Sequence, residues 1–159
     1  MNAMRNKGIV VVVTALLTCL NLSAQSSIDD TDQLKELINS ISKGVNSQKS
    51  NLILDAFIHP SALIYSTFRG LSSGEYSKKS TTAQGLADFV KNSEEKINQE
   101  FDFIDVEMID AGRAIVKTYY RVQIDGKKSH MGDEFYSVIK TKGGWKIISL
   151  MFTMELWSD

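Results

Sequence analysis

The last third of the chain consists of three long segments with the composition of β-strands, separated by two short turns. The segments are residues 113–124, 127–140 and 145–156, and each is rich in β-branched and aromatic residues. Asp125-Gly126 separates the first two segments and Lys142-Gly143-Gly144 the last two, and both are turn sequences. Successive strands of this length predict a strongly curved antiparallel sheet that helices cover on one face.

Helical periodicity characterises much of the chain before these strands. Thr31 or Asp32 is a suitable cap for a first helix, whose apolar residues follow a three–four spacing. The buried stripe of this helix is expected to be Leu34, Leu37, Ile38, Ile41 and Val45. A second helix is expected over residues 50–57, and His59-Pro60 ends it because the residue before a proline avoids helical angles. We expect a third helix over residues 81–98.

Shorter strands are expected on both sides of the third helix. Residues 62–68 have the composition of a strand, and residues 101–109 alternate between apolar and acidic side chains. Residues 69–80 are polar and rich in Ser and Gly, which predicts a loop. Because the sequence contains no internal repeat and no long linker, we expect a single domain over residues 26–159.

Residues 1–25 have the layout of a secretory signal peptide. A short basic region, Arg5 to Lys7, precedes an apolar run over residues 9–22, and small residues follow. The run is shorter than the roughly 20 residues that a membrane span needs. We expect cleavage after Gln25, with cleavage after Ala24 as the near alternative, and therefore an exported domain, periplasmic or secreted.

Two other interpretations of this segment stay open. One is an N-terminal anchor that is not cleaved. The other is a lipoprotein, because Leu16-Leu17-Thr18-Cys19 loosely resembles a bacterial lipoprotein box.

Removal of residues 1–25 takes away the only cysteine, Cys19, and two basic residues. The mature domain then has no disulfide, so its stability depends on its core. It carries 16 Lys and Arg residues against 19 Asp and Glu residues. Because this mildly acidic chain lacks a basic stripe, we expect no nucleic-acid partner, and no membrane span once the signal is removed.

The order of these elements resembles the nuclear-transport-factor-2-like superfamily. Residues 57–62 (Phe-Ile-His-Pro-Ser-Ala), 133–135 (Asp-Glu-Phe) and 143–148 (Gly-Gly-Trp-Lys-Ile-Ile) resemble its lumazine-binding and SnoaL-like branch. The resemblance covers residues 30–153 and implies an α+β cone-shaped fold, in which about three N-terminal helices cover a strongly curved antiparallel sheet. It also implies a pocket between helices and sheet. Members include isomerases, cyclases, dehydratases and domains without known activity, so the resemblance leaves the activity open.

The register of the last hairpin decides which side chains face this pocket. With a three-residue loop and a left-handed Gly143, Ile139 pairs with Ile147 and Asp133 with Thr153. The pocket face is then expected to carry Asp133, Phe135, Ser137, Ile139, Trp145, Ile147 and Met151. The opposite face is expected to carry Glu134, Tyr136, Ile148, Leu150 and Phe152. Both faces are apolar enough to be covered, which predicts helices on one and a homodimer contact on the other.

Asp133 is the candidate acid–base residue, since a carboxyl group with little water around it is suited to proton transfer. The expected ligand-binding residues are Tyr65, Tyr120, His130, Phe135, Ser137 and Met151. Each also has an ordinary interpretation as a core or rim side chain. His59 and His130 lack the close spacing of a zinc site, so we expect neither a metal nor another cofactor.

We therefore expect a domain that binds a small apolar or aromatic organic molecule without catalysing a reaction. The alternative is an isomerase, dehydratase or cyclase in which one carboxylate moves a proton. A structural module that binds another protein is the third possibility. No nucleophile elbow and no glycine-rich phosphate loop occurs in the sequence.

Overall fold

The computed structural model describes residues 29–69 and 76–157. The chain divides into two compact units, residues 1–33 and 34–159, and of the first unit only the start of the first helix (residues 29–46) is described. The predicted signal peptide and Cys19 lie outside the described residues.

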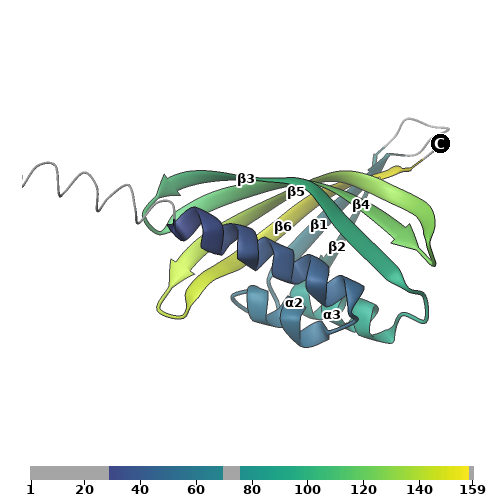
Figure 1. Ribbon diagram of the computed structural model, residues 1–159, viewed down its shortest axis with the longest axis horizontal. Coiled ribbons are helices and arrows are strands. Elements are labelled where there is room, and N and C mark those ends of the chain that lie inside the picture. The colour runs from purple at the N-terminus through teal and green to yellow at the C-terminus, as the bar shows by residue number, and fades with distance from the viewer. Residues whose placement is uncertain (1–28, 70–75, 158–159) are drawn as a thin grey trace, which may run out of the picture. The chain divides into compact units, whose positions relative to one another are not determined.

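The second unit contains two further helices and six strands, which Figure 1 labels. The helices are α2 (Ser50–Ala56) and α3 (Ala83–Asn92), and the strands are β1 (Leu63–Arg69), β2 (Tyr76–Thr82), β3 (Ile97–Asp110), β4 (Arg113–Ile124), β5 (Lys127–Thr141) and β6 (Gly144–Leu156).

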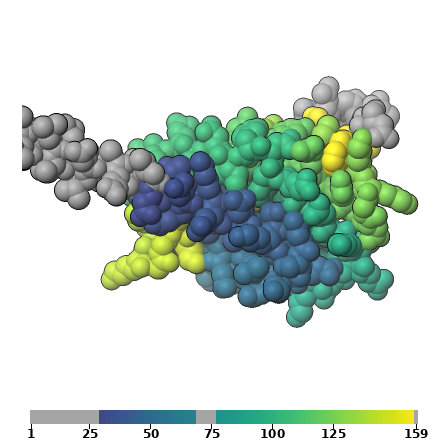
Figure 2. Space-filling view, viewed as in Figure 1, coloured from purple at the N-terminus to yellow at the C-terminus, as the bar shows by residue number. Residues whose placement is uncertain are grey.

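The six strands form one curved, open sheet in the order β2-β1-β6-β5-β4-β3. All neighbouring pairs are antiparallel except β1 and β6, which are parallel, so the sheet is mixed rather than purely antiparallel. The helices lie on one side of it (Figure 1), and the side chains of the first helix and α2 form a continuous surface there (Figure 2). The predicted α+β architecture, with helices over a curved sheet, is confirmed.

The apolar stripes of the helices and the helix-facing side of the sheet form one core. Leu34, Ile38 and Ile41 of the first helix are almost fully buried, as the three–four spacing predicts. The sheet contributes Ile64, Val116, Tyr120, Tyr136, Val138, Ile147 and Leu150, all nearly inaccessible.

Two predicted helix boundaries are wrong. The first helix already includes residues 29–33, so Thr31 and Asp32 lie inside it and are not its caps. The third helix ends at Asn92, and Ile97 begins β3 instead of continuing the helix. Thr82 caps the start of α3, where its hydroxyl oxygen accepts a hydrogen bond from the Gly85 N–H over 3.1 Å.

The predicted loop over residues 69–80 is also wrong in part, because residues 76–82 form β2. β2 is an edge strand that pairs only with β1. Lysine and hydroxyl side chains are common on such strands, where they discourage pairing with another chain. Its polar composition therefore hides the strand from a search for apolar alternation.

The last hairpin departs from the predicted register at one residue. Ser137 pairs with Ser149 as predicted, but Val138 pairs with Ile147, so Ile148 is an extra residue on β6. The turn is also tighter than predicted, since Thr141 pairs with Gly144. Gly144 rather than Gly143 has the positive φ, 100°.

The bulge at Ile148 reverses the predicted faces over most of the hairpin. An extra residue on one strand shifts its alternation by one position. Trp145 and Ile147 are buried as predicted. The other predicted pocket-face residues, Asp133, Phe135, Ser137, Ile139 and Met151, point away from the helices. The helix-facing residues there are Glu134, Tyr136, Leu150 and Phe152, which the predicted register assigned to the opposite face.

Gly132 on β5 lies under a close crossing of the backbone of β6. A Cβ atom on this residue would lie 2.1 Å from the carbonyl oxygen of Thr153. The same oxygen accepts a hydrogen bond from the Tyr120 hydroxyl over 2.8 Å, so the aromatic ring reaches from β4 across to β6.

We predict that Gly132→Ala lowers the free energy of unfolding by about 1–3 kcal/mol, the usual cost of overpacking. The matched control is Gly143→Ala, where the nearest atom to the new Cβ, the Thr141 hydroxyl oxygen, lies 3.8 Å away. Urea unfolding followed by tryptophan fluorescence measures both. Equal midpoints for the two variants would contradict the close approach.

Candidate functional site

Glu134 is a buried carboxyl group on the helix-facing side of β5. Only 5% of the residue is exposed. Its Oε1 accepts a hydrogen bond from Gln99 Nε2 over 3.1 Å, and its Oε2 accepts one from Thr118 Oγ1 over 3.2 Å. The Tyr136 hydroxyl donates a third to Oε2. β3, β4 and β5 thus each supply one donor to this carboxyl group.

Burial raises the pKa of Glu134 to about 7, although its three hydrogen bonds act in the opposite direction. Desolvation penalises the charged form, and among the described residues no ion pair to Glu134 offsets this penalty. A carboxyl group with such a pKa exchanges protons near neutral pH, as acid–base catalysis requires.

Gln99 connects this carboxyl group to the first helix. The backbone N–H of Gln99 donates to Asn46 Oδ1 over 2.6 Å, and its carbonyl oxygen accepts from Ser42 Oγ over 2.7 Å and Asn46 Nδ2 over 2.9 Å. The backbone of Gln99 thus holds the end of the helix, while its side chain holds Glu134.

Tyr120 lies edge-on to two other rings on the same side of the sheet. Its ring centroid is 5.8 Å from that of His130 and 6.1 Å from that of Phe152. Partial burial lowers the pKa of His130 and so favours its neutral form. The three side chains form an apolar group with the Tyr120 hydroxyl and the His130 imidazole as its polar atoms.

A small hollow of about 260 Å³ lies farther along the sheet, over β2, β1 and β6. Its lining residues are Ser66, Phe68, Ser77, Lys79 and Met154. Phe68 and Met154 provide an apolar floor, and the other three offer two hydroxyl groups and an ammonium group. Pockets that bind small molecules measure roughly 300–1,000 Å³, so this hollow lies just below that range and has room only for a small ligand.

The hollow and the buried carboxyl group lie on the same row across the sheet. Ser66 pairs with Phe152, and Phe152 pairs with Glu134. Because neighbouring strands lie about 4.8 Å apart, Ser66 and Glu134 are separated by about 10 Å. The half-buried ring of Phe152 stands between them.

The predicted site residues divide between the two faces of the sheet and do not form one site. Tyr120 and His130 lie on the helix-facing side, next to one another. Tyr65, Asp133, Phe135, Ser137 and Met151 lie on the opposite face. Asp133 is partly exposed there and lies 3.4 Å from the Lys117 Nζ atom, so its position does not suit the role of a desolvated base.

Sequence reasoning missed Glu134 and the residues of the hollow. Glu134 is adjacent to Asp133, so the two point to opposite faces of the sheet. Because the bulge at Ile148 was not predicted, each was assigned to the wrong face. The residues of the hollow include Ser77 and Lys79, which belong to the strand that was predicted as a loop. Glu134 shares its side of the strand with Gly132, Tyr136 and Val138, none of which is charged, and this was the signal available in the sequence.

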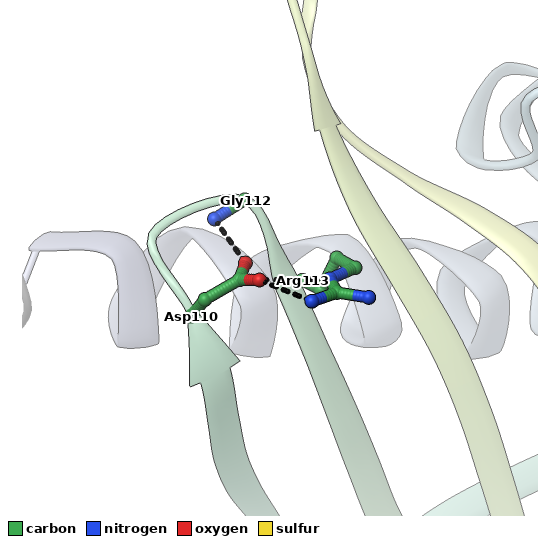
Figure 3. Close-up of polar contacts among 3 residues, drawn as sticks. All are labelled: Asp110, Gly112 and Arg113. Carbon is green, nitrogen blue, oxygen red and sulfur yellow. Dashed lines mark hydrogen bonds and ion pairs between the residues drawn. The ribbon is translucent and has the colours of Figure 1, made fainter.

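The turn between β3 and β4 carries a second carboxyl group with a shifted pKa, that of Asp110 (Figure 3). Asp110 Oδ2 accepts a hydrogen bond from Arg113 Nε over 2.8 Å, and Oδ1 accepts one from the Gly112 N–H over 2.9 Å. The Arg113 guanidinium, followed by the Gly112 N–H, lowers the pKa of Asp110. The Asp110 carboxylate is exposed to solvent, and its two hydrogen bonds stabilise the turn.

Within residues 29–69 and 76–157, no three His, Cys, Asp or Glu side chains are grouped in a way that could hold a metal ion. None of the helices in the described part of the chain is long and apolar enough to cross a membrane.

Comparison with solved structures identifies the fold. The chain matches an NTF2-like protein of unknown function from Shewanella oneidensis at a TM-score of 0.59 and 16% identity, over 77% of this chain and 98% of that one. The chain has the NTF2-like fold. No protein-family model and no curated protein sequence matches it.

Two other proteins with this NTF2-like architecture come from Novosphingobium aromaticivorans. One is named a putative scytalone dehydratase and matches at a TM-score of 0.63 and 10% identity, over 82% of this chain and 87% of that one. The other is named a putative aromatic ring hydroxylase. It matches at a TM-score of 0.57 and 20% identity, over 83% of this chain and 92% of that one. At such identities the likeness establishes the fold and no activity.

We predict that Glu134→Gln reduces the loss of stability between pH 4.5 and pH 7. The folded-state pKa, about 7, lies above the ordinary value of 4.5, so the folded protein favours the protonated acid. That contribution is present below pH 4.5 and is lost as the pH rises through 7. Relative to the Gln variant, the wild type should lose on the order of 3 kcal/mol across this range.

Urea unfolding at several pH values measures this difference, and subtraction of the two proteins removes the contribution of other groups, His130 included. Asp133→Asn is the matched control because it alters the neighbouring carboxylate on the opposite face; it should keep the wild-type trend. Parallel pH curves for the wild type and Glu134→Gln would contradict the prediction.

Proposed function

We propose that this NTF2-like domain binds a small organic molecule with an apolar body and one anionic group, in the hollow over β2, β1 and β6. The observation that carries the proposal is the composition of its lining. Phe68 and Met154 suit an apolar ring, while Lys79 and the hydroxyl groups of Ser66 and Ser77 suit a carboxylate or a similar acceptor. The sequence predicts a small apolar or aromatic ligand, and the lining of the hollow adds that this ligand carries a negative charge.

One structure of the same fold supports an aromatic ligand. The protein from Novosphingobium aromaticivorans that is 20% identical to this chain is named a putative aromatic ring hydroxylase. The fold that it shares with this chain therefore accommodates a protein named for aromatic chemistry, although the fold itself does not determine the ligand.

An acid–base enzyme is the second candidate function, and Glu134 favours it. Its carboxyl group has a pKa of about 7, and it faces the same side of the sheet as the hollow. In this alternative Glu134 replaces Asp133 as the residue that moves a proton, and Phe152 has to turn aside for a ligand to reach it. The reaction would be an isomerisation or dehydration.

The test is a panel of single-ring aromatic carboxylates, with the matching uncharged amides, screened by ligand-observed NMR. We predict that carboxylates bind and that Lys79→Gln weakens their binding about two- to fivefold, the magnitude of an exposed ion pair. Lys78→Gln is the matched control, because Lys78 neighbours Lys79 on β2 but faces the other side of the sheet. Ser66→Phe, which fills the hollow, should abolish binding.

Absence of binding by every panel member, or equal loss with Lys78→Gln and Lys79→Gln, would contradict this location of the site. The same NMR samples report whether a bound compound is converted. Conversion by the wild type and none by Glu134→Gln, with retained binding, would establish the enzyme instead of the binder.

We also propose that the domain is exported and that residues 1–25 are removed. The order of basic, apolar and small residues in this segment supports the proposal. Mass spectrometry of protein produced in a bacterial host should find a mature N-terminus at Ser26. A soluble cytoplasmic product that retains residues 1–25 would contradict export, and a lipid mass on Cys19 would establish the lipoprotein.

A further inference from the structure

Phe152 on β6 separates the hollow from the interior of the domain. It pairs with Ser66 of β1, which lines the hollow, and with Glu134 of β5, which is buried. Two residues along the same face of β6, Met154 also lines the hollow, whereas Leu150, two residues the other way, is buried. Phe152 itself is partly buried. Its side chain therefore forms the inner end of the hollow.

Tyr120 supports the Phe152 ring from the interior and is itself held in place. The two rings lie edge-on, with their centroids 6.1 Å apart. The Tyr120 hydroxyl donates a hydrogen bond to the Thr153 carbonyl oxygen over 2.8 Å, and the residue is almost fully buried. The Phe152 ring has no polar atom, so packing alone fixes it. Of the two rings, Phe152 is therefore the one that can be removed without breaking a hydrogen bond.

The size of the hollow limits how many rings a ligand can place in it. An apolar cavity of about 150 Å³ is enough to hold one benzene molecule. The hollow measures about 260 Å³, which leaves space for a carboxylate beside one ring. Two rings and a carboxylate need more space than this.

The position of Lys79 determines which end of such a ligand lies at Phe152. Lys79 of β2 pairs with Ser66, and Ser66 pairs with Phe152, so the three residues form one row across β2, β1 and β6. Because neighbouring strands are about 4.8 Å apart, the first and last backbones of this row are separated by about 10 Å. A carboxylate bound at Lys79 therefore directs the ring over β1, with its far edge toward Phe152.

We propose that Phe152 determines the length of the ligand, because its ring occupies the place into which a second ring, fused in line with the first, would extend. This inference rests on the proposed function, since it takes the ligand of the hollow to be an aromatic carboxylate. A smaller residue at position 152 converts a site for one ring into a site for two. The second ring then packs against Tyr120 and Leu150, in the place of the side chain that was removed.

The test compares the binding of benzoate, 2-naphthoate and 1-naphthoate to the purified protein by NMR titration. 2-Naphthoate is longer than benzoate, whereas 1-naphthoate has the same two rings but is wider. We expect Phe152→Ala to raise the affinity for 2-naphthoate, relative to that for benzoate, by about tenfold or more, the usual effect of a change in the shape of an apolar pocket. The relative affinity for 1-naphthoate should change much less.

Met151→Ala is the matched control, because Met151 neighbours Phe152 on β6 but points to the opposite face of the sheet. It should keep the wild-type ratio of affinities. Phe152→Leu retains a smaller apolar side chain and serves if loss of the whole side chain unfolds the domain. It should shift the ratio in the same direction as Phe152→Ala. Circular dichroism melts establish that each variant is folded.

A second measurement locates the added ring. The Met154 methyl group belongs to the hollow, and the Leu150 methyl groups lie on the interior side of Phe152. Nuclear Overhauser effects from benzoate bound to the wild type should reach Met154 and not Leu150. With 2-naphthoate bound to Phe152→Ala they should reach both. Effects confined to Met154 in that complex would overturn the inference.

The outcomes distinguish this inference from the proposed function. If the wild type binds benzoate and both Phe152 variants keep its ratio of affinities, the inference is wrong and the proposed function stands. An equal rise with Met151→Ala, or equal gains for the two naphthoates, would also overturn it, because position 152 would then not select for length. If none of these proteins binds any of the three carboxylates, the proposed function is wrong and the inference fails with it.

Discussion

Ile148 is an extra residue that interrupts the alternation of side chains along β6. Because of it, large apolar side chains of β6 face the helices both before and after this position. Trp145 and Ile147 point to the core before it, and Leu150 and Phe152 point to the core after it. In a regular strand one of these pairs would face solvent. Burial of a large apolar side chain contributes about 1.5–3 kcal/mol, so loss of either pair would remove a large part of the 5–15 kcal/mol by which a domain is usually stable.

The same residue also determines which carboxyl group is enclosed. With the bulge, Glu134 is buried on the helix-facing side of the sheet and Asp133 lies on the opposite face. Three uncharged donors surround Glu134, and one of them, Gln99, also holds the end of that helix through its backbone. Removal of the Gln99 side chain would leave Glu134 Oε1 without its donor, and a buried acceptor without a partner typically costs about 1–3 kcal/mol. The network therefore links the position of the helix to the state of one carboxyl group.

The sequence predicts the parts of the fold that are governed by apolar periodicity. β4 has the predicted bounds, Arg113–Ile124, and the stripe of the first helix is buried as its spacing indicates. Tyr120 also lies on the predicted face of its strand. β2 was missed because an edge strand with lysine and hydroxyl side chains carries no such periodicity.

The candidate site was less predictable than the fold, for a geometric reason. Side chains alternate along a strand with a period of two. One unrecognised bulge therefore assigns every residue beyond it to the wrong face of the sheet. The sequence around Ile148 gives no glycine or other signal for that bulge. The error therefore moved Asp133, Phe135, Ser137 and Met151 together, while Tyr120 and His130, placed independently of that hairpin, stayed on the helix-facing side.

The parallel pairing of β1 with β6 has a consequence for how the domain reaches its native state. β1 ends at Arg69 and its neighbour begins at Gly144, so the two can meet only when nearly the whole chain has been synthesised. Until then the β1–β2 hairpin and the β3–β5 meander have no strand between them. Contacts between such distant segments make folding slow and leave apolar surface exposed in the meantime. The C-terminal strand is therefore the step that joins the two halves of the sheet, and a chain that stops before Gly144 retains two separate β-segments.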